Sequence, residues 1–212
     1  MIEPKKFEER WETFSSKYIN DFERFWKYKL EIENNSGNIL DKSHLNTTHH
    51  RLCEILRGWQ AYRPFGLDRN ILKKALKSIS EHYKVICNYS LRNIDEVPRT
   101  HLKSIWVELG KVKSESESDY QYVISVCKPL MLMWGQTLAF DSKVRKNIPH
   151  PVTAKSRWKF ETWISILQDF SHKINQNPEI IDFFKEWSRK RFGTNDSVPY
   201  GRFLDIYFYS GS

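Results

Sequence analysis

The chain has 212 residues, of which 40% are hydrophobic and 15% aromatic, so it can bury a sizeable core and is not typical of a disordered protein. Its 34 basic and 26 acidic residues give a formal net charge of +8, which favours a polyanionic partner such as nucleic acid or an anionic membrane surface. No apolar run approaches the roughly 18 residues that a membrane-spanning helix requires, so we expect no membrane partner.

The cysteines and the N-terminus indicate a cellular compartment. Cys53, Cys87 and Cys127 form no CxxC pair and leave an odd thiol, which argues for a reducing environment and against a disulfide framework. The first residues, MIEPKKFEERW, lack the apolar core of a secretory signal. We therefore expect a cytoplasmic protein of bacterial type.

The first third of the chain has the periodicity of amphipathic helices. Aromatic residues recur at intervals of three and four from Phe7 to Phe25, which predicts one helix that begins at Pro4 and ends at the polar stretch 34–38. A second helix is expected over about 45–62. Asp68 is a favourable N-cap for a third helix. The buried stripe of that third helix would consist of Leu72, Ala75, Leu76, Ile79, Tyr83 and Ile86.

A polar loop divides the chain near its middle. Pro98 starts a short helix that Gly110 ends, and the stretch 113–119 is then strongly polar. The sequence predicts an all-α protein, either as one compact helical domain over residues 1–212 or as two lobes, about 1–112 and 120–212, joined by that loop.

The last third is also predicted to be helical, with no convincing pair of alternating strands. A long helix is expected over about 156–176, and Asn177 with Pro178 should begin another helix that Gly193 ends. The tail VPYGRFLDIYFY is aromatic and apolar, so it should pack back onto the body.

A polar group interrupts that apolar tail. It comprises Tyr200, Gly201, Arg202 and Asp205. An ion pair between Arg202 and Asp205 at a spacing of three residues is its ordinary explanation, and lining a pocket is the alternative.

The segment VCKPLMLMWGQTLAFDSKVRK carries the most specific chemical pattern. Lys128 directly precedes Pro129, and proline prefers the first turn of a helix, so Lys128 is expected at a helix N-terminus. The residues after it are too apolar to be exposed. A partly desolvated lysine beside a positive helix end should have a lowered pKa, which makes its amine nucleophilic near neutral pH.

The carboxylate of Asp141 follows Lys128 along the chain. Gly135 should end the helix, and Asp141 can cap a short helix that starts at Ser142. This helix–loop–helix return would bring Asp141 near Lys128. The ordinary alternatives are a lysine that packs its stem while its amine reaches water, and an aspartate that serves only as a cap.

A basic stretch comes next. Residues 142–159 contain no acidic side chain, and His150 and Trp158 are interleaved with the cations, which suits a track for a nucleic-acid backbone. The expected nucleic-acid-binding residues are Lys143, Arg145, Lys146, Lys155, Arg157 and Lys159.

Residues 126–141 resemble the active-site strip of the helix-hairpin-helix DNA glycosylases, in particular the 8-oxoguanine DNA glycosylase branch. Val126-Cys127-Lys128 stands where that family has Val-Gly-x-Lys, and Leu138-Ala139-Phe140-Asp141 where it has apolar residues before its aspartate. Two features depart from the family: Ser125 and Cys127 occupy the places of hairpin glycines, and the interval from lysine to aspartate is shorter by several residues.

The resemblance implies a two-lobed helical fold with a cleft and a DNA N-glycosylase or lyase that needs no cofactor or metal. Lys128 would attack the sugar C1′ to form a Schiff base, and Asp141 would stabilise the oxocarbenium charge and assist proton transfer. A base flipped from the duplex would enter a pocket walled by Trp134 or Phe140. Since distant glycosylase-fold proteins occur in bacterial antiviral gene clusters, a defence role is also implied.

Two other functions remain open on the sequence. One is a non-catalytic nucleic-acid-binding or assembly subunit that retains the fold, and the shorter lysine–aspartate interval favours it. The other is a protein–protein module whose basic face meets an acidic partner. DNA is favoured over RNA as the nucleic acid. No P-loop, dinucleotide-binding glycine pattern, GxSxG or HExxH occurs, which excludes the commonest nucleotide-driven and zinc-protease classes.

Overall fold

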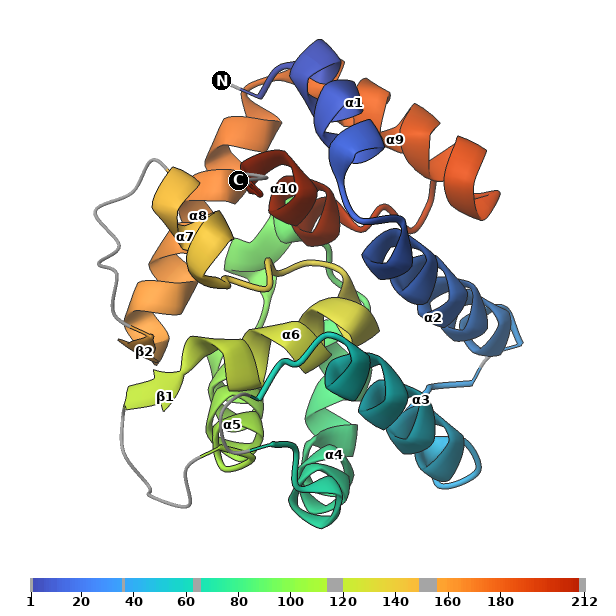
Figure 1. The fold of residues 1–212 in the computed structure, drawn as a ribbon, viewed down its shortest axis with the longest axis vertical. Helices are drawn as coiled ribbons and strands as arrows, with labels where there is room; N and C mark the ends of the chain where they lie inside the picture. Colours follow the sequence, from blue (N-terminus) through green and yellow to red (C-terminus); the bar gives the residue numbers. More distant parts are fainter. Residues whose placement is uncertain (1, 36, 63–65, 114–119, 149–155, 210–212) are drawn as a thin grey trace.

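The structure, a computed structural model, confirms that the protein is all-α, with a two-stranded sheet as its only described β-structure (Figure 1). It describes every residue except 1, 36, 63–65, 114–119, 149–155 and 210–212. The helices are α1 (Pro4–Thr13), α2 (Ser16–Asn34), α3 (Leu45–Gly58), α4 (Arg69–Ile86), the 3-10 helix η1 (Leu91–Glu96), α5 (Arg99–Gly110), α6 (Val123–Trp134), α7 (Ser142–Asn147), α8 (Phe160–Asn175), α9 (Pro178–Phe192) and α10 (Tyr200–Phe208). The strands are β1 (Tyr120–Tyr122) and β2 (Arg157–Lys159).

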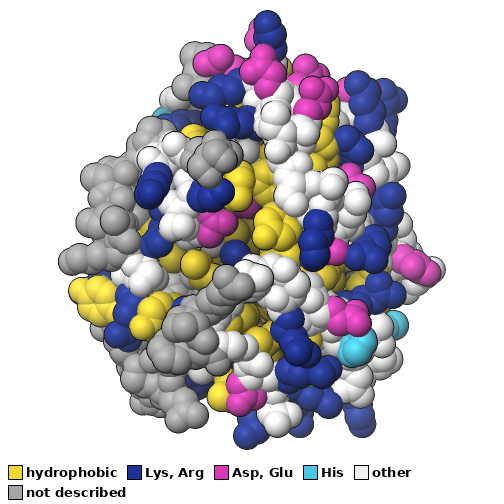
Figure 2. All heavy atoms as spheres, viewed as in Figure 1, with side chains coloured by type: hydrophobic (Ala, Val, Ile, Leu, Met, Phe, Trp, Pro, Cys, Tyr) yellow, Lys and Arg dark blue, Asp and Glu magenta, His cyan; other side chains and the backbone are white. Residues whose placement is uncertain are grey.

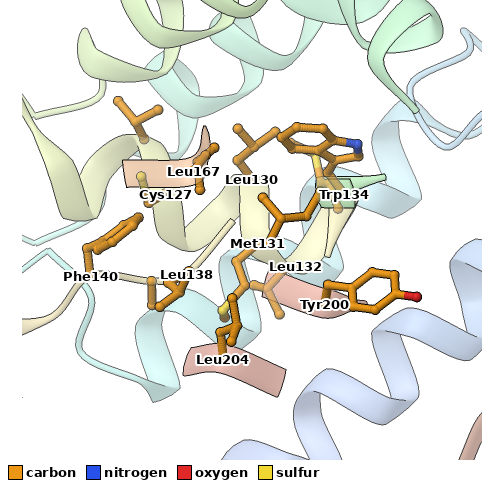
Figure 3. Close-up of a cluster of buried hydrophobic side chains, with 14 of the residues drawn as sticks. Cys127, Leu130, Met131, Leu132, Trp134, Leu138, Phe140, Leu167, Tyr200 and Leu204 are labelled. Carbon is orange, nitrogen blue, oxygen red and sulfur yellow. The ribbon is translucent and has the colours of Figure 1, made fainter. Parts of the chain in front are cut away.

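Helix α6 crosses the middle of the molecule and contacts α2, α3, α5 and β1 (Figure 1). Its sequence, VISVCKPLMLMW, is apolar on nearly every side, which is typical of a helix surrounded by protein. Figure 3 shows its side chains, among them Leu130, Met131 and Leu132, packed among those of Leu138 and Leu204. The core therefore forms around α6.

Elements from the two halves of the chain pack together. Helix α1 lies against α10, and α2 contacts both α6 and α9 (Figure 1). As a result, α10 at the end of the chain is buried along most of its length, as predicted for the apolar tail. None of the helices in the described ranges is long and apolar enough to cross a membrane.

The helix expected from Pro4 to the polar stretch at 34–38 is in fact two helices. Phe14 is extended (φ −71°, ψ 148°), and its N–H closes α1 by donating to the Arg10 carbonyl. Because of this break Phe14 turns inward, where its ring lies 4.7 Å from that of Tyr209. The three-and-four spacing of apolar residues continues across the break, so the periodicity does not reveal it.

The helix expected from residue 156 begins only at Phe160. Residues 157–159 form β2, which pairs antiparallel with β1 and places Trp158 opposite Gln121. Strands of three residues are too short to show an alternating pattern, so the absence of strands was wrongly predicted. The second predicted helix ends at Gly58 rather than near 62.

The predicted N-caps of two helices are confirmed. The Asp68 carboxylate accepts hydrogen bonds from the backbone N–H groups of Asn70 and Ile71 at the start of α4, and the predicted stripe of that helix is buried. Asn177 caps α9, which ends at Gly193 in the left-handed conformation (φ 78°).

Candidate functional site

Lys128 does not lie at a helix N-terminus, so that prediction was wrong. Helix α6 begins at Val123, and Pro129 lies inside it. Proline has no N–H to donate to the carbonyl four residues earlier, which here belongs to Ser125. The Tyr62 hydroxyl donates to that carbonyl instead (3.3 Å). This tertiary hydrogen bond supplies a donor that the helix lacks, and it allows proline beyond the first turn.

The pKa of the Lys128 amine is nevertheless lowered, and burial is the main cause because it disfavours the charged form. The Asp141 and Asp205 carboxylates oppose the shift, and the Arg202 guanidinium adds to it. The side chain is half-buried. A lowered pKa was therefore correctly expected, although desolvation and not the helix dipole produces it.

Asp141 caps α7, as predicted. One oxygen of its carboxylate accepts hydrogen bonds from the backbone N–H groups of Lys143 and Val144, both at 3.0 Å. The preceding residue, Phe140, has a left-handed backbone (φ 51°), which is strained for a bulky side chain. Its ring is buried against Trp158 of β2, with the centroids 5.0 Å apart. Packing on one side and capping on the other thus fix where Asp141 lies.

Helix α10 holds the segment 135–141 that connects α6 to Asp141. The Arg202 backbone N–H donates to the Gly135 carbonyl (3.2 Å), and the Asp205 carboxylate accepts from the Ala139 N–H (2.8 Å). Gly201 lies so close that an added Cβ would be 2.3 Å from the Thr137 backbone nitrogen. Contacts with Gly135, Thr137 and Ala139 therefore hold this connection against α10, an arrangement called the clamp below.

Arg202 and Asp205 form the predicted ion pair, Nη1 to Oδ2, at 2.8 Å, and both side chains are buried. Burial raises the pKa of Asp205 to about 6, while Arg202 opposes that rise. The guanidinium lies over the rings of Phe14, Phe22 and Trp59 at 5.0–5.5 Å from their centroids, and its Nη2 donates to the Tyr18 carbonyl.

These groups share one electrostatic environment, here called the charge cluster: Lys128, Asp141, Arg202 and Asp205. Asp141 and Asp205 each affect the pKa of Lys128, and Asp141 and Lys128 each affect that of Asp205. Among the described residues, Lys128 and Asp141 form no direct ion pair. Lys128 and Asp141 thus interact electrostatically, although no ion pair joins these two described residues.

The sequence did not place Arg202 and Asp205 in this charge cluster. They lie more than sixty residues after Lys128 and Asp141 in the chain, and only the packing of α10 joins the two segments. The one available signal was a polar group inside an otherwise apolar tail, because buried charges are uncommon unless they are paired.

Trp134 and Phe140, the predicted pocket walls, are not brought together. Figure 3 shows them at opposite ends of the buried cluster around α6. Both rings are almost fully buried, and the Trp134 indole N–H donates to the Tyr89 carbonyl (2.9 Å). Trp134 instead borders a separate cavity at the end of α6.

Figure 2 shows Lys and Arg side chains at several separate places on one face of the molecule. The predicted cations divide into two groups. On α7, Lys143 and Arg145 are half-buried and Lys146 is exposed. On β2, Arg157 and Lys159 are both exposed on the same side of the strand, with Trp158 turned inward between them. The remaining predicted cation, Lys155, lies outside the described residues.

No group of three His, Cys, Asp or Glu side chains that could hold a metal ion occurs among the residues that the structure places. His49 and Cys53 lie four residues apart on α3, a spacing that two metal ligands on a helix could also have. The His49 Nε2 atom lies 2.8 Å from the Arg69 carbonyl and 3.3 Å from the Cys53 sulfur, so these groups hydrogen-bond within the protein.

No family model matches the chain, and searches of curated proteins and of solved structures also found no match. The charge cluster and the exposed cations of α7 and β2 are therefore the observations from which a function is inferred.

Proposed function

We propose that this protein is a glycosylase-like enzyme that acts on a nucleotide flipped out of DNA, with Lys128 as the nucleophile and Asp141 as the assisting carboxylate. The observation that carries this proposal is a largely desolvated lysine amine that interacts electrostatically with a carboxylate fixed by its role as a helix cap. Burying a lysine without a direct ion pair costs stability, and such groups concentrate at functional sites.

In the proposed reaction the Lys128 amine is the nucleophile and the Asp141 carboxylate accepts a proton. The neutral Lys128 amine attacks the sugar C1′, the bond from C1′ to the base breaks, and the base leaves with the bonding electrons and takes up a proton. The attacking nitrogen gives a proton to Asp141, and the departing base takes its proton from water. Asp141 then passes its proton to the ring oxygen O4′ as the bond from C1′ to O4′ breaks, which leaves a protonated Schiff base between Lys128 and C1′. Water then hydrolyses this Schiff base. A lowered amine pKa increases the fraction of neutral nucleophile near pH 7.

The exposed cations support a nucleic-acid partner. Lys146 on α7 and Arg157 with Lys159 on β2 carry charge that sequence-independent phosphate contacts require. Both elements adjoin the connection that carries Asp141, since α7 follows it and Trp158 of β2 packs on Phe140. A bound strand would therefore run past the charge cluster.

The test is borohydride trapping, which reduces a Schiff base to a stable covalent link. The wild-type protein should trap on duplex DNA that contains an abasic site, and Lys128→Gln should abolish trapping. Lys77→Gln is the matched control, because Lys77 is an exposed lysine of α4 far along the chain from the cluster. Undiminished trapping by Lys128→Gln would remove Lys128 from the mechanism.

Asp141→Asn separates the two roles of the aspartate. Asparagine caps helices about as well as aspartate, so α7 should persist while the charge is lost. The variant should fold normally and trap at least about tenfold more slowly, since general acid–base catalysis contributes roughly 10²–10⁴-fold.

The second candidate is a non-catalytic nucleic-acid-binding or assembly subunit. The burial of both Trp134 and Phe140 favours it, because neither ring is exposed to stack on a flipped base. For such a protein Lys128→Gln would change nothing that a binding assay measures. The triple variant Lys146→Ala, Arg157→Ala and Lys159→Ala would still weaken binding, and it would reduce the slope of log K against log salt by up to about 2.7 if each cation contacts one duplex phosphate.

A further inference from the structure

A second site lies at the C-terminal end of α6, on a cavity that the proposed chemistry does not use. The cavity has a volume of about 200 Å³ and lies between α2, η1, α9 and the segment 195–198. Trp134 and Tyr200 form part of its wall, and Figure 3 shows the Tyr200 hydroxyl directed away from the apolar cluster. Ligand pockets for drug-sized molecules are commonly about 300–1,000 Å³, so this space suits a smaller ligand.

Positive charge dominates the lining. Three cations, Lys29, Arg92 and Lys185, face one lining carboxylate, that of Asp196. Lys29 is buried (3% exposed) and is neutralised by Glu33, whose carboxylate lies 2.5 Å from its ammonium. Arg92 and Lys185 form no ion pair with any carboxylate among the described residues. The lining therefore carries one carboxylate and two cations that lack an ion-pair partner in the described part of the chain, and this excess of positive charge in a partly enclosed space favours an anion.

Arg92 is held in position by α8. The Arg92 Nε donates to the Asn175 side-chain oxygen (2.9 Å), and its backbone carbonyl accepts from Ser171 and Asn175 of α8. Burial raises the pKa of the Tyr200 hydroxyl, and the Arg92 guanidinium partly opposes this rise. Because Nε donates to Asn175, the terminal nitrogens of Arg92 are the groups that remain for a ligand of the cavity, and two such nitrogens can bind a phosphate side by side.

The rest of the lining is rich in neutral polar groups. Hydroxyl and amide side chains come from Asn88, Ser90, Asn195 and Ser197. The Gln136 amide is already used, since its oxygen accepts from the Leu91 N–H and its nitrogen donates to the Val198 carbonyl. It therefore fixes the wall of the cavity. The Asn88 amide nitrogen donates to the Lys84 carbonyl. The Ser90 hydroxyl donates to the Asn93 side-chain oxygen, so these two donors are used as well. Asn195 and Ser197 therefore remain to meet the hydroxyl groups of a sugar or a similar ligand.

We propose that this cavity binds a small phosphate monoester that carries hydroxyl groups, with Arg92 and Lys185 holding the phosphate. The ligand would contact Trp134 and Gln136 at the start of the connection to Asp141. It would therefore stabilise the same connection that α10 holds in place. Binding does not require that Lys128 act as a nucleophile.

The test is calorimetric titration of the full chain with ribose 5-phosphate at constant ionic strength, with ribose as the uncharged comparison. Ribose 5-phosphate should bind saturably, ribose should not, and inorganic phosphate should compete. Lys185→Gln should weaken binding about tenfold, as expected for the loss of one charge-assisted hydrogen bond. Lys190→Gln is the matched control, because Lys190 is an exposed lysine of the same helix that does not line the cavity.

Lys185 is half-exposed, so its replacement should leave the thermal unfolding of the protein unchanged. Absence of saturable binding by the wild-type protein would overturn the proposal. Equal weakening by Lys185→Gln and Lys190→Gln would overturn it too, because the effect would then reflect general charge and not the cavity. Equal binding of ribose and ribose 5-phosphate would exclude the phosphate as the recognised group.

Discussion

The close packing of α10 against the segment 135–141 can be tested by a substitution that adds a single methyl group at Gly201. In Gly201→Ala the new Cβ would lie 2.3 Å from the Thr137 nitrogen, 2.4 Å from the Gln136 carbonyl carbon and 2.6 Å from the Thr137 carbonyl carbon. All three atoms belong to the backbone, so α10 or the connection must move. Overpacking of this kind costs about 1–3 kcal/mol, whereas glycine to alanine in a helix gains about 1 kcal/mol from propensity.

Because contact below 3.0 Å with three backbone atoms is severe, the steric cost should win. We expect the free energy of unfolding to fall by about 2 kcal/mol, measured by urea denaturation with an unchanged m-value. Gly58→Ala is the matched control, since Gly58 also lies in a helix and its Cβ would meet only the flexible end of Lys17. That variant should be as stable as the wild type or slightly more stable. A Gly201→Ala protein with wild-type stability would refute the clamp.

Three further predictions concern buried polar groups. Burial raises the pKa of Asp205 to about 6, so the folded state holds this proton more tightly than the unfolded state does. The free energy of unfolding of the wild type, relative to that of Asp205→Asn, should therefore fall by up to about 3 kcal/mol as the pH rises from 4 to 6. Above pH 6 the difference should stay level. Parallel pH curves for the two proteins would contradict this. Lys128→Met should raise the free energy of unfolding by on the order of 1 kcal/mol at pH 7, because a desolvated charge is removed. A large loss of stability would contradict this and would mean that Lys128 stabilises the fold. Tyr62→Phe should lower the free energy of unfolding by about 1–2 kcal/mol, because the buried Ser125 carbonyl loses its donor, and the same urea titration measures it.

Local signals predicted those parts of the fold that local interactions determine. Helix α4 has a side-chain cap at Asp68 and one apolar stripe, and both are read directly from neighbouring residues. The same holds for α9 between Asn177 and Gly193, and for the cap of α7 at Asp141. In each case the side chain that decides the structure lies within four residues of the backbone that it stabilises.

The errors arose where distant residues decide the local structure. Proline normally marks the first turn of a helix, but Tyr62 supplies the hydrogen bond that permits Pro129 inside α6, and Lys128 is displaced from the helix end. The strand β2 forms because β1 lies beside it, and a three-residue strand carries no pattern of its own. Sequence periodicity cannot report such partners.

The candidate site was predicted in part. Lys128 and Asp141 were singled out from their local sequence, and the fold brings them into one electrostatic environment. Arg202 and Asp205 were expected only to pair with each other. Their contact with this environment depends on the close approach of α10 at Gly201, which no spacing in the chain encodes.

The proposed function requires that the Lys128 amine form a covalent bond with a sugar carbon. Digestion of the borohydride-trapped complex, followed by mass spectrometry of the peptides, locates this bond. The proposal predicts that the sugar adduct lies on the peptide that contains Lys128 and on no other lysine. No adduct at all, or an adduct on a surface lysine such as Lys146, would contradict it.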